Sequence, residues 1–179
     1  MAGAFGAGLV IRGGLPGTPG GPAAPPVTVA GNQLSPWVKA AMEYQQLYTR
    51  DSVAYVPDVD QQTLARFVDD ARDQDKLDFQ VPDLSAAGLE LKSVARLRFR
   101  NKALVQIVYL PREGAPVSLC ILAEPKDDQG VTASQVDAMR VMTWRRARLG
   151  YALLGNTQGL DLEAIARQIA DGTAPRYRS

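Results

Sequence analysis

Arginine is the residue type whose spacing in this sequence most clearly suggests chemistry. Arg96, Arg98 and Arg100 alternate with apolar residues, so a β-strand would place all three on one face. A second group combines cations with aromatic rings and comprises Trp144, Arg145, Arg146, Arg148 and Tyr151. Guanidinium groups bind anions and acidic partners. The pattern predicts an anion or partner surface; the alternative is a solvated sheet face that complements an acidic helix.

Side chains for the common catalytic and metal centres are scarce. The sequence contains no histidine and a single cysteine, Cys120. Ser-His-Asp and Cys-His nucleophile systems therefore lack a base, and zinc sites with histidine or several cysteines are excluded. A lone cysteine also excludes an internal disulfide, and we interpret Cys120 as a small structural thiol within a strand. No Gly-Lys-Ser/Thr phosphate loop is present, and we expect no cofactor.

The carboxylates are numerous but dispersed. Asp58 and Asp60 have the spacing of a calcium loop but lack its glycine turn and its later glutamate. Asp69 and Asp70 are neighbours in sequence, and such neighbours do not share a helix face. We therefore predict that the protein is not an enzyme. The competing hypothesis of carboxylate catalysis requires Asp58, Asp60 and Glu43 to line one cleft.

The composition favours one folded domain behind an N-terminal extension. Of 179 residues, 46% are hydrophobic and the net charge is +1, which permits a core but lacks the basic excess typical of nucleic-acid-binding domains. Residues 1–12 form a short apolar segment, either a tail or the end of a transmembrane helix with Arg12 at the membrane boundary. Residues 13–32 are rich in Gly and Pro and predict a linker. We place the domain at 33–172 and a flexible tail at 173–179.

The elements that position the arginines follow from periodicity. Ser35-Pro36 predicts a helix start, Asp60 caps a second helix, and a third helix begins after Gly159. Between the first two helices, Val53–Val56 reads as an extended piece. The second helix has an acidic outer face, which comprises Asp69, Asp70, Asp73 and Asp75. Alternating or continuous apolar runs predict strands at 95–100, 105–109, 117–122, 139–146 and 149–154, with a loop at 127–130.

These elements predict an α+β fold. We expect an antiparallel sheet of about five strands, with two N-terminal helices and one C-terminal helix packed on one face. On this sheet, we expect one face of the strand at 95–100 to be buried and the other, which carries the arginines, to be exposed to solvent and basic.

Two sequence blocks resemble a known family. The first, residues 81–91, reads Val-Pro-Asp-Leu-Ser-Ala-Ala-Gly-Leu-Glu-Leu, and the second combines 141–144, Val-Met-Thr-Trp, with 149–155, Leu-Gly-Tyr-Ala-Leu-Leu-Gly. With the leucine-rich closing helix, they resemble the extracytoplasmic, C-terminal domain of bacterial transmembrane anti-sigma factors. The resemblance covers roughly Gln33 to Asp171.

The resemblance implies that the cytoplasmic and the outer domain of such a protein have different roles. In that family an N-terminal cytoplasmic domain, often with a His-x-x-x-Cys-x-x-Cys zinc motif, grips the sigma factor, and one transmembrane helix joins it to the outer domain. The 179 residues contain no such motif. They would therefore reach a sigma factor only through a missing N-terminal part, while the outer domain, on the extracytoplasmic side of the cell membrane, binds an envelope protein or a small ligand. A stand-alone exported binding module is the alternative.

Overall fold

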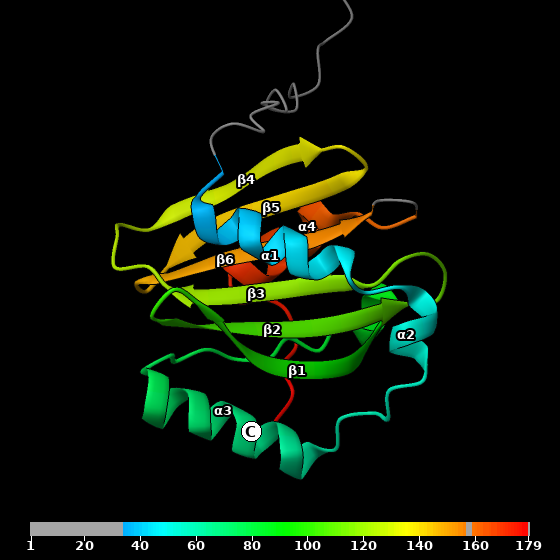
Figure 1. Cartoon of the computed structure of the whole chain (residues 1–179), viewed down its shortest axis with the longest axis horizontal. Helices are drawn as coiled ribbons and strands as arrows, with labels where there is room; N and C mark the ends of the chain where they lie inside the picture. The colour runs from blue at the N-terminus through cyan, green and yellow to red at the C-terminus, as the bar shows by residue number, and fades with distance from the viewer. Residues whose placement is uncertain (1–33, 157–158, 179) are drawn as a thin grey trace, which may run out of the picture.

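The structure, a computed structural model, describes residues 34–156 and 159–178 (Figure 1). Three helices come first: α1 (Pro36–Gln46), α2 (Arg50–Ala54) and α3 (Gln61–Asp75). A short 3-10 helix, η1 (Ser85–Ala87), leads into the strands. The strands are β1 (Leu89–Phe99), β2 (Lys102–Pro111), β3 (Val117–Ala123), β4 (Gln129–Val136), β5 (Met139–Arg146) and β6 (Leu149–Asn156). Helix α4 (Leu162–Ala170) follows, so the α+β prediction is confirmed.

The six strands form one antiparallel sheet in the order β1-β2-β3-β6-β5-β4. The predicted strands are all present, and β4 is an additional strand. The sequence Gln-Gly-Val-Thr-Ala-Ser-Gln-Val gives β4 few strongly apolar residues, because it is an edge strand with one neighbour. The predicted loop at 127–130 therefore ends earlier than expected, at the start of β4.

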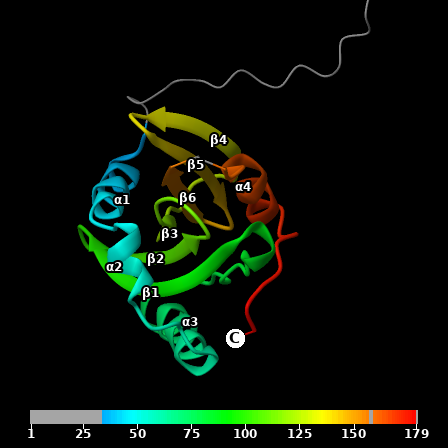
Figure 2. The same cartoon turned by 90° about the vertical axis from the view of Figure 1, so that its right-hand side faces the viewer.

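Helices cover both faces of the sheet, which corrects the expectation that they share one face. Figure 2 shows α1 and α4 on opposite sides of the central strands. In β2, Leu104 packs into the cluster that includes α1, whereas Val105 packs into the cluster that includes α3 and α4. Strand β3 alternates in the same way, with Cys120 facing α1 and Ile121 facing the other side. The central strands are near-continuous apolar runs because both of their faces are buried.

Local sequence explains the helix boundaries. Asp60 is the N-cap of α3 and accepts a hydrogen bond from the Thr63 amide, as predicted. The extended piece expected at 53–56 is wrong, because Thr49 and Ser52 form a capping box that starts α2. Within 173–178, part of the segment for which a flexible tail was predicted, the Tyr177 amide donates to the Val81 carbonyl at 3.0 Å. That pairing satisfies backbone groups that would otherwise need water.

The predictions for residues 1–12 and 13–32 lie outside the described residues. Among residues 34–156 and 159–178, none of the helices has the length and apolar character needed to cross a membrane.

Candidate functional site

The predicted arginines gather at one end of the sheet but not in one site. The β1–β2 and β5–β6 turns lie at the same end, because Leu104 pairs with Leu122 and Leu122 pairs with Gly150. The loop between β3 and β4 lies there too, at the left of Figure 1. Three strands, β2, β3 and β6, separate β1 from β5, at about 4.8 Å per strand step. The two arginine groups therefore occupy different parts of this end.

In the arginine group on β1, Arg96 makes contacts that stabilise the fold. Arg96 Nη2 lies 2.6 Å from Asp75 Oδ2, and its guanidinium also donates to the side chain of Gln74 at 3.2 Å. Asp75 Oδ2 accepts no hydrogen bond with suitable geometry, so the contact between Asp75 and Arg96 is an ion pair without a hydrogen bond. It fixes the end of α3 against β1, and Asp75 does not belong to the solvated acidic face on which it was predicted. The Arg100 guanidinium lies 5.2 Å from the centre of the Phe99 ring, and among the described residues Arg98 has no ion-pair partner.

Strand alternation sends Arg145 and Arg146 to opposite faces of β5. Arg145 Nε donates to the Asp127 carbonyl at 3.0 Å, on the α1 side. Arg146 donates to the Ala170 carbonyl at the end of α4. Arg148 occupies the β5–β6 turn with a φ of 65°, and its carbonyl accepts from the Glu124 amide at 2.9 Å. The predicted surface therefore divides into two grooves.

The α4 groove has a volume of about 290 Å³ and holds the aromatic pair. Trp144 and Tyr151 stack with centroids 5.2 Å apart, and burial raises the pKa of Tyr151 to about 12. Arg146 and Arg176 line the groove and donate to the Ala170 and Gly172 carbonyls, where α4 ends. Cations at this position stabilise the negative end of a helix dipole. Arg146 of β5 therefore holds the end of α4 on the sheet, and the Arg176 bond stays within the segment that follows α4.

The α1 groove lies on the opposite face, between the start of α1 and the edge of the sheet formed by β4 and β5. Its volume is about 260 Å³. Hydroxyl and amide side chains contribute much of its lining: Ser35, Gln129, Thr132, Ser134 and Thr143. Its aromatic and charged residues are Trp37, Glu124, Lys126 and Arg145, together with Trp144 and Tyr151, which line both grooves. A lining of this kind can bind a polar ligand through several directed hydrogen bonds.

Glu124 is the organising residue of the α1 groove. Its side chain is 12% exposed and receives hydrogen bonds from Trp37 Nε1 at 3.3 Å and from Lys126 Nζ at 3.1 Å. The carboxylate lies across β6 at Gly150, where a Cβ would come within 2.4 Å of Glu124 Oε2. Gly150 therefore leaves the space in which Glu124 reaches Trp37. This contact ties the first turn of α1 to the sheet.

The sequence prediction named Trp144, Arg145 and Tyr151 from the lining of the α1 groove, but it did not predict the groove itself. None of the candidate site residues was Trp37 or Glu124. One signal was available: Glu124 follows the apolar run of β3 without a turn, and Gly150 interrupts an otherwise apolar β6. An acid at the end of a buried strand and a glycine inside the next strand indicate a close approach.

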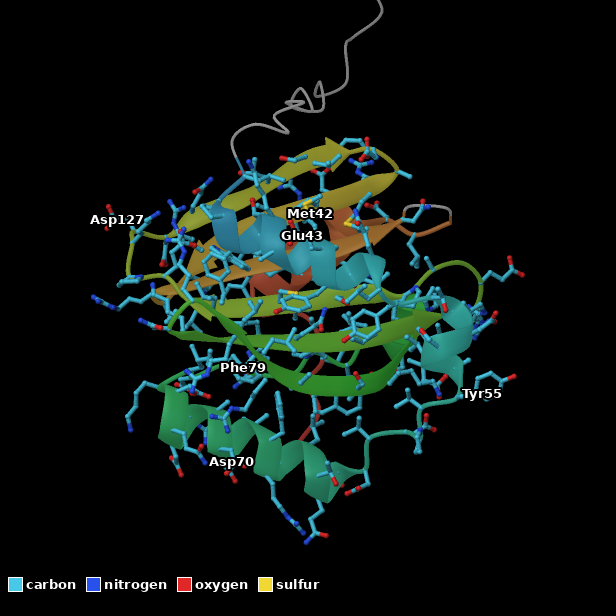
Figure 3. The ribbon with its side chains drawn as sticks, viewed as in Figure 1. Met42, Glu43, Tyr55, Asp70, Phe79 and Asp127 are labelled. Carbon is cyan, nitrogen blue, oxygen red and sulfur yellow. The ribbon has the colours of Figure 1, made fainter. Side chains whose placement is uncertain are left out.

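The carboxylates named for catalysis do not come together among the described residues. Asp58 accepts a hydrogen bond from Lys92 at 2.6 Å, Asp60 caps α3, and Glu43 is exposed on α1, in front of the sheet in Figure 3. Asp70 points away from the sheet on α3. Burial raises the pKa of the fully buried Cys120 thiol to about 12, which suits a structural residue.

Metal ligands do not cluster in the part of the chain that the structure describes. Comparisons of the chain with protein-family models, curated proteins and solved structures give no match.

Proposed function

We propose that this chain is the extracytoplasmic sensor or interaction domain of a bacterial anti-sigma factor, which regulates transcription by restraining a sigma factor. Support for the family comes from the two sequence blocks. In the structure the first block forms the turn into β1, where Gly88 has a φ of 78° and the Ser85 amide donates to Asp83 at 3.0 Å. The second block forms the β5–β6 hairpin, including the glycine that accommodates Glu124.

The observation that carries a sensing role is the position of α1. This helix forms one wall of the α1 groove, and it directly follows the N-terminal segment in sequence. A ligand that contacts α1 and the sheet together would bind more tightly when α1 is docked than when it is displaced. Such differential affinity is what couples binding to a change elsewhere in a protein. The proposed signal therefore passes from the groove to α1, and from α1 to the residues before it.

Within this proposal the folded domain lies outside the cell membrane, and sigma-factor contact belongs to residues that precede it in a longer protein. The test is to read the DNA upstream of Met1 in all frames and to express the longest in-frame product. We expect a transmembrane segment and a neighbouring sigma-factor gene, and we expect the sigma factor to co-purify with the longest product but not with the 179-residue chain. If no sigma factor co-purifies with the longest product, the alternative of a stand-alone exported binding module replaces the proposal.

A further inference from the structure

Strand β4 is an open edge of the sheet. It pairs with β5, and among the described residues no other backbone segment hydrogen-bonds to it. In an antiparallel strand every second residue directs its N–H and C=O away from the paired neighbour, so β4 presents a row of free donors and acceptors. The strand contains neither a charged residue nor a proline over Gln129–Val136. Natural edge strands usually carry such residues because they prevent pairing with other chains.

The other edge of the sheet shows the usual protection. Strand β1 carries Lys92, Arg96 and Arg98, whereas β4 carries no charged residue; both edge strands have a register shift in their pairing, between Leu91 and Ser93 in β1 and between Gln129 and Thr132 in β4. Helix α3 is tied to it by the ion pair between Asp75 and Arg96. The difference between the two edges indicates that β4 is left open for a partner strand.

The α1 groove runs beside this open edge. Thr132 and Ser134 of β4 form one side of the groove, and Ser35 and Trp37 form the other. A strand added to β4 would direct alternate side chains toward the α1 face. Those side chains would enter the groove, which would provide sequence selectivity, while the backbone hydrogen bonds would provide affinity.

The charge of the groove selects among possible added strands. Lys126 neutralises Glu124 at 3.1 Å, whereas Arg145 donates to a backbone carbonyl and keeps its full charge. Asp127 and Asp128 belong to the loop before β4 and are not among the residues that line the groove, and Asp127 extends outward from the loop (Figure 3). The start of α1 adds a partial positive charge. The groove therefore favours a negatively charged occupant.

We propose that an extended, acidic segment of a partner protein adds to β4 as a further strand and places alternate side chains in the α1 groove. This inference deepens the proposed function and rests on it only in taking the α1 groove as the binding site. The partner is thus identified by its chemistry: an unfolded stretch with alternating residues and a net negative charge.

The experiment begins with the full 179-residue chain and a display library of random decapeptides. We expect the selected peptides to be richer in Asp and Glu than in Lys and Arg. The best peptide is then synthesised in two further forms, N-methylated at its odd or at its even central residues, and binding is measured by fluorescence anisotropy. Since a strand exposes alternate N–H groups to β4, one form should bind at least about tenfold more weakly than the parent and the other nearly as well.

A matched pair of variants locates the site. Arg145→Gln should weaken the acidic peptide by about three- to tenfold, because it removes the uncompensated charge of the groove. Arg140→Gln is the control, since it removes the same charge from the far end of the same strand. Equal binding of both N-methylated forms, equal effects of the two variants, or failure to select any peptide would overturn the proposal. So would a chain that dimerises through β4 and is not displaced by peptide, because β4 would then belong to a second copy.

The two proposals can fail separately. If a sigma factor co-purifies with the longest product but the two N-methylated forms bind alike, strand addition is wrong and the regulatory role stands. If one N-methylated form alone loses binding but no sigma factor co-purifies, the groove binds a strand and the anti-sigma role is wrong.

Discussion

Replacing Gly150 by alanine tests the arrangement that joins α1 to the sheet. The added Cβ would lie 2.4 Å from Glu124 Oε2 and 3.0 Å from Trp37 Cζ2. The φ of Gly150 is not positive, so the substitution introduces no backbone strain, and any effect comes from these contacts. The Glu124 carboxylate must move, and the movement breaks its hydrogen bond with Trp37.

The expected loss of stability follows from two overlapping effects. Overpacking a core position costs about 1–3 kcal/mol, and loss of a hydrogen bond to a charged group costs about 1.5–3 kcal/mol. The Trp37–Glu124 bond is long at 3.3 Å, and the movement that relieves the clash is the one that breaks the bond. We therefore expect Gly150→Ala to lower the free energy of unfolding by about 1–3 kcal/mol in total.

The assay is urea unfolding followed by tryptophan fluorescence, in a double-mutant cycle with Glu124→Ala. Once Glu124 is removed, the alanine at 150 should cost about 1 kcal/mol less, which is a measurable coupling. Gly155→Ala is the matched control, because Gly155 lies in the same strand as Gly150. Its added Cβ would lie 2.9 Å from Val117 Cγ2, away from Glu124. If Gly150→Ala and Glu124→Ala add to within about 0.3–0.5 kcal/mol, the account of the α1 groove is refuted.

Four further perturbations probe other parts of the structure. The Cys120 thiol should not react with a disulfide reagent at pH 8 until the protein unfolds, because it is fully buried with a pKa raised to about 12; rapid labelling of the native chain would contradict this. Tyr151 has a pKa raised from 10.0 to about 12, so its contribution to stability is complete below pH 10 and is lost as the pH rises to about 12; Tyr151→Phe should flatten the pH dependence of unfolding across that window. Gln106→Met removes the hydrogen bond from the Tyr48 hydroxyl to Oε1 at 3.0 Å together with the buried Nε2, which has no partner among the described residues; the two effects should nearly offset, and a fall in the free energy of unfolding of more than about 1–2 kcal/mol would contradict this. Asp75→Asn should destabilise the protein by about 1–2 kcal/mol through loss of the α3–β1 ion pair, whereas the exposed Asp70→Asn should change stability by less than about 0.5 kcal/mol.

Much of the sheet was predictable because its strands are bounded by clear signals. The two-residue turn at 147–148, with positive φ at Ala147 and Arg148, matches the hairpin expected between β5 and β6. Strand β4 was not predicted, because an edge strand with one covered face needs little apolar sequence. Helix α2 was missed because Val53–Val56 is apolar and short, although Thr49 and Ser52 carry its capping signal.

The covering of both sheet faces was also present in the sequence. The near-continuous apolar run of β3, in which Ser118 is the one polar residue, is typical of a strand buried on both sides, whereas the alternation of β1 holds only for an edge. The expectation of a single covered face was drawn from the order of the elements along the chain, not from the apolar content of each strand.

The site itself was less accessible to sequence reasoning. Alternation alone implies that Arg145 and Arg146 face opposite ways, which already divides the predicted surface. The contact between Trp37 and Glu124 spans 87 residues, and Arg176 reaches the α4 groove from the end of the chain. Local periodicity carries no information on such pairings, because they depend on the strand order and on how the helices close over the sheet.

Amide hydrogen exchange at the first turn of α1 tests the central claim most directly. The measurement follows the Trp37 and Val38 amides and those of β4 in the full chain, with and without the selected acidic peptide. Because the groove is formed jointly by α1 and the sheet, the account predicts that peptide slows exchange in both elements, and that Gly150→Ala weakens the effect at α1. Slower exchange in β4 with no change at α1 would show that occupancy of the groove does not reach the helix, and would contradict the proposed path of the signal.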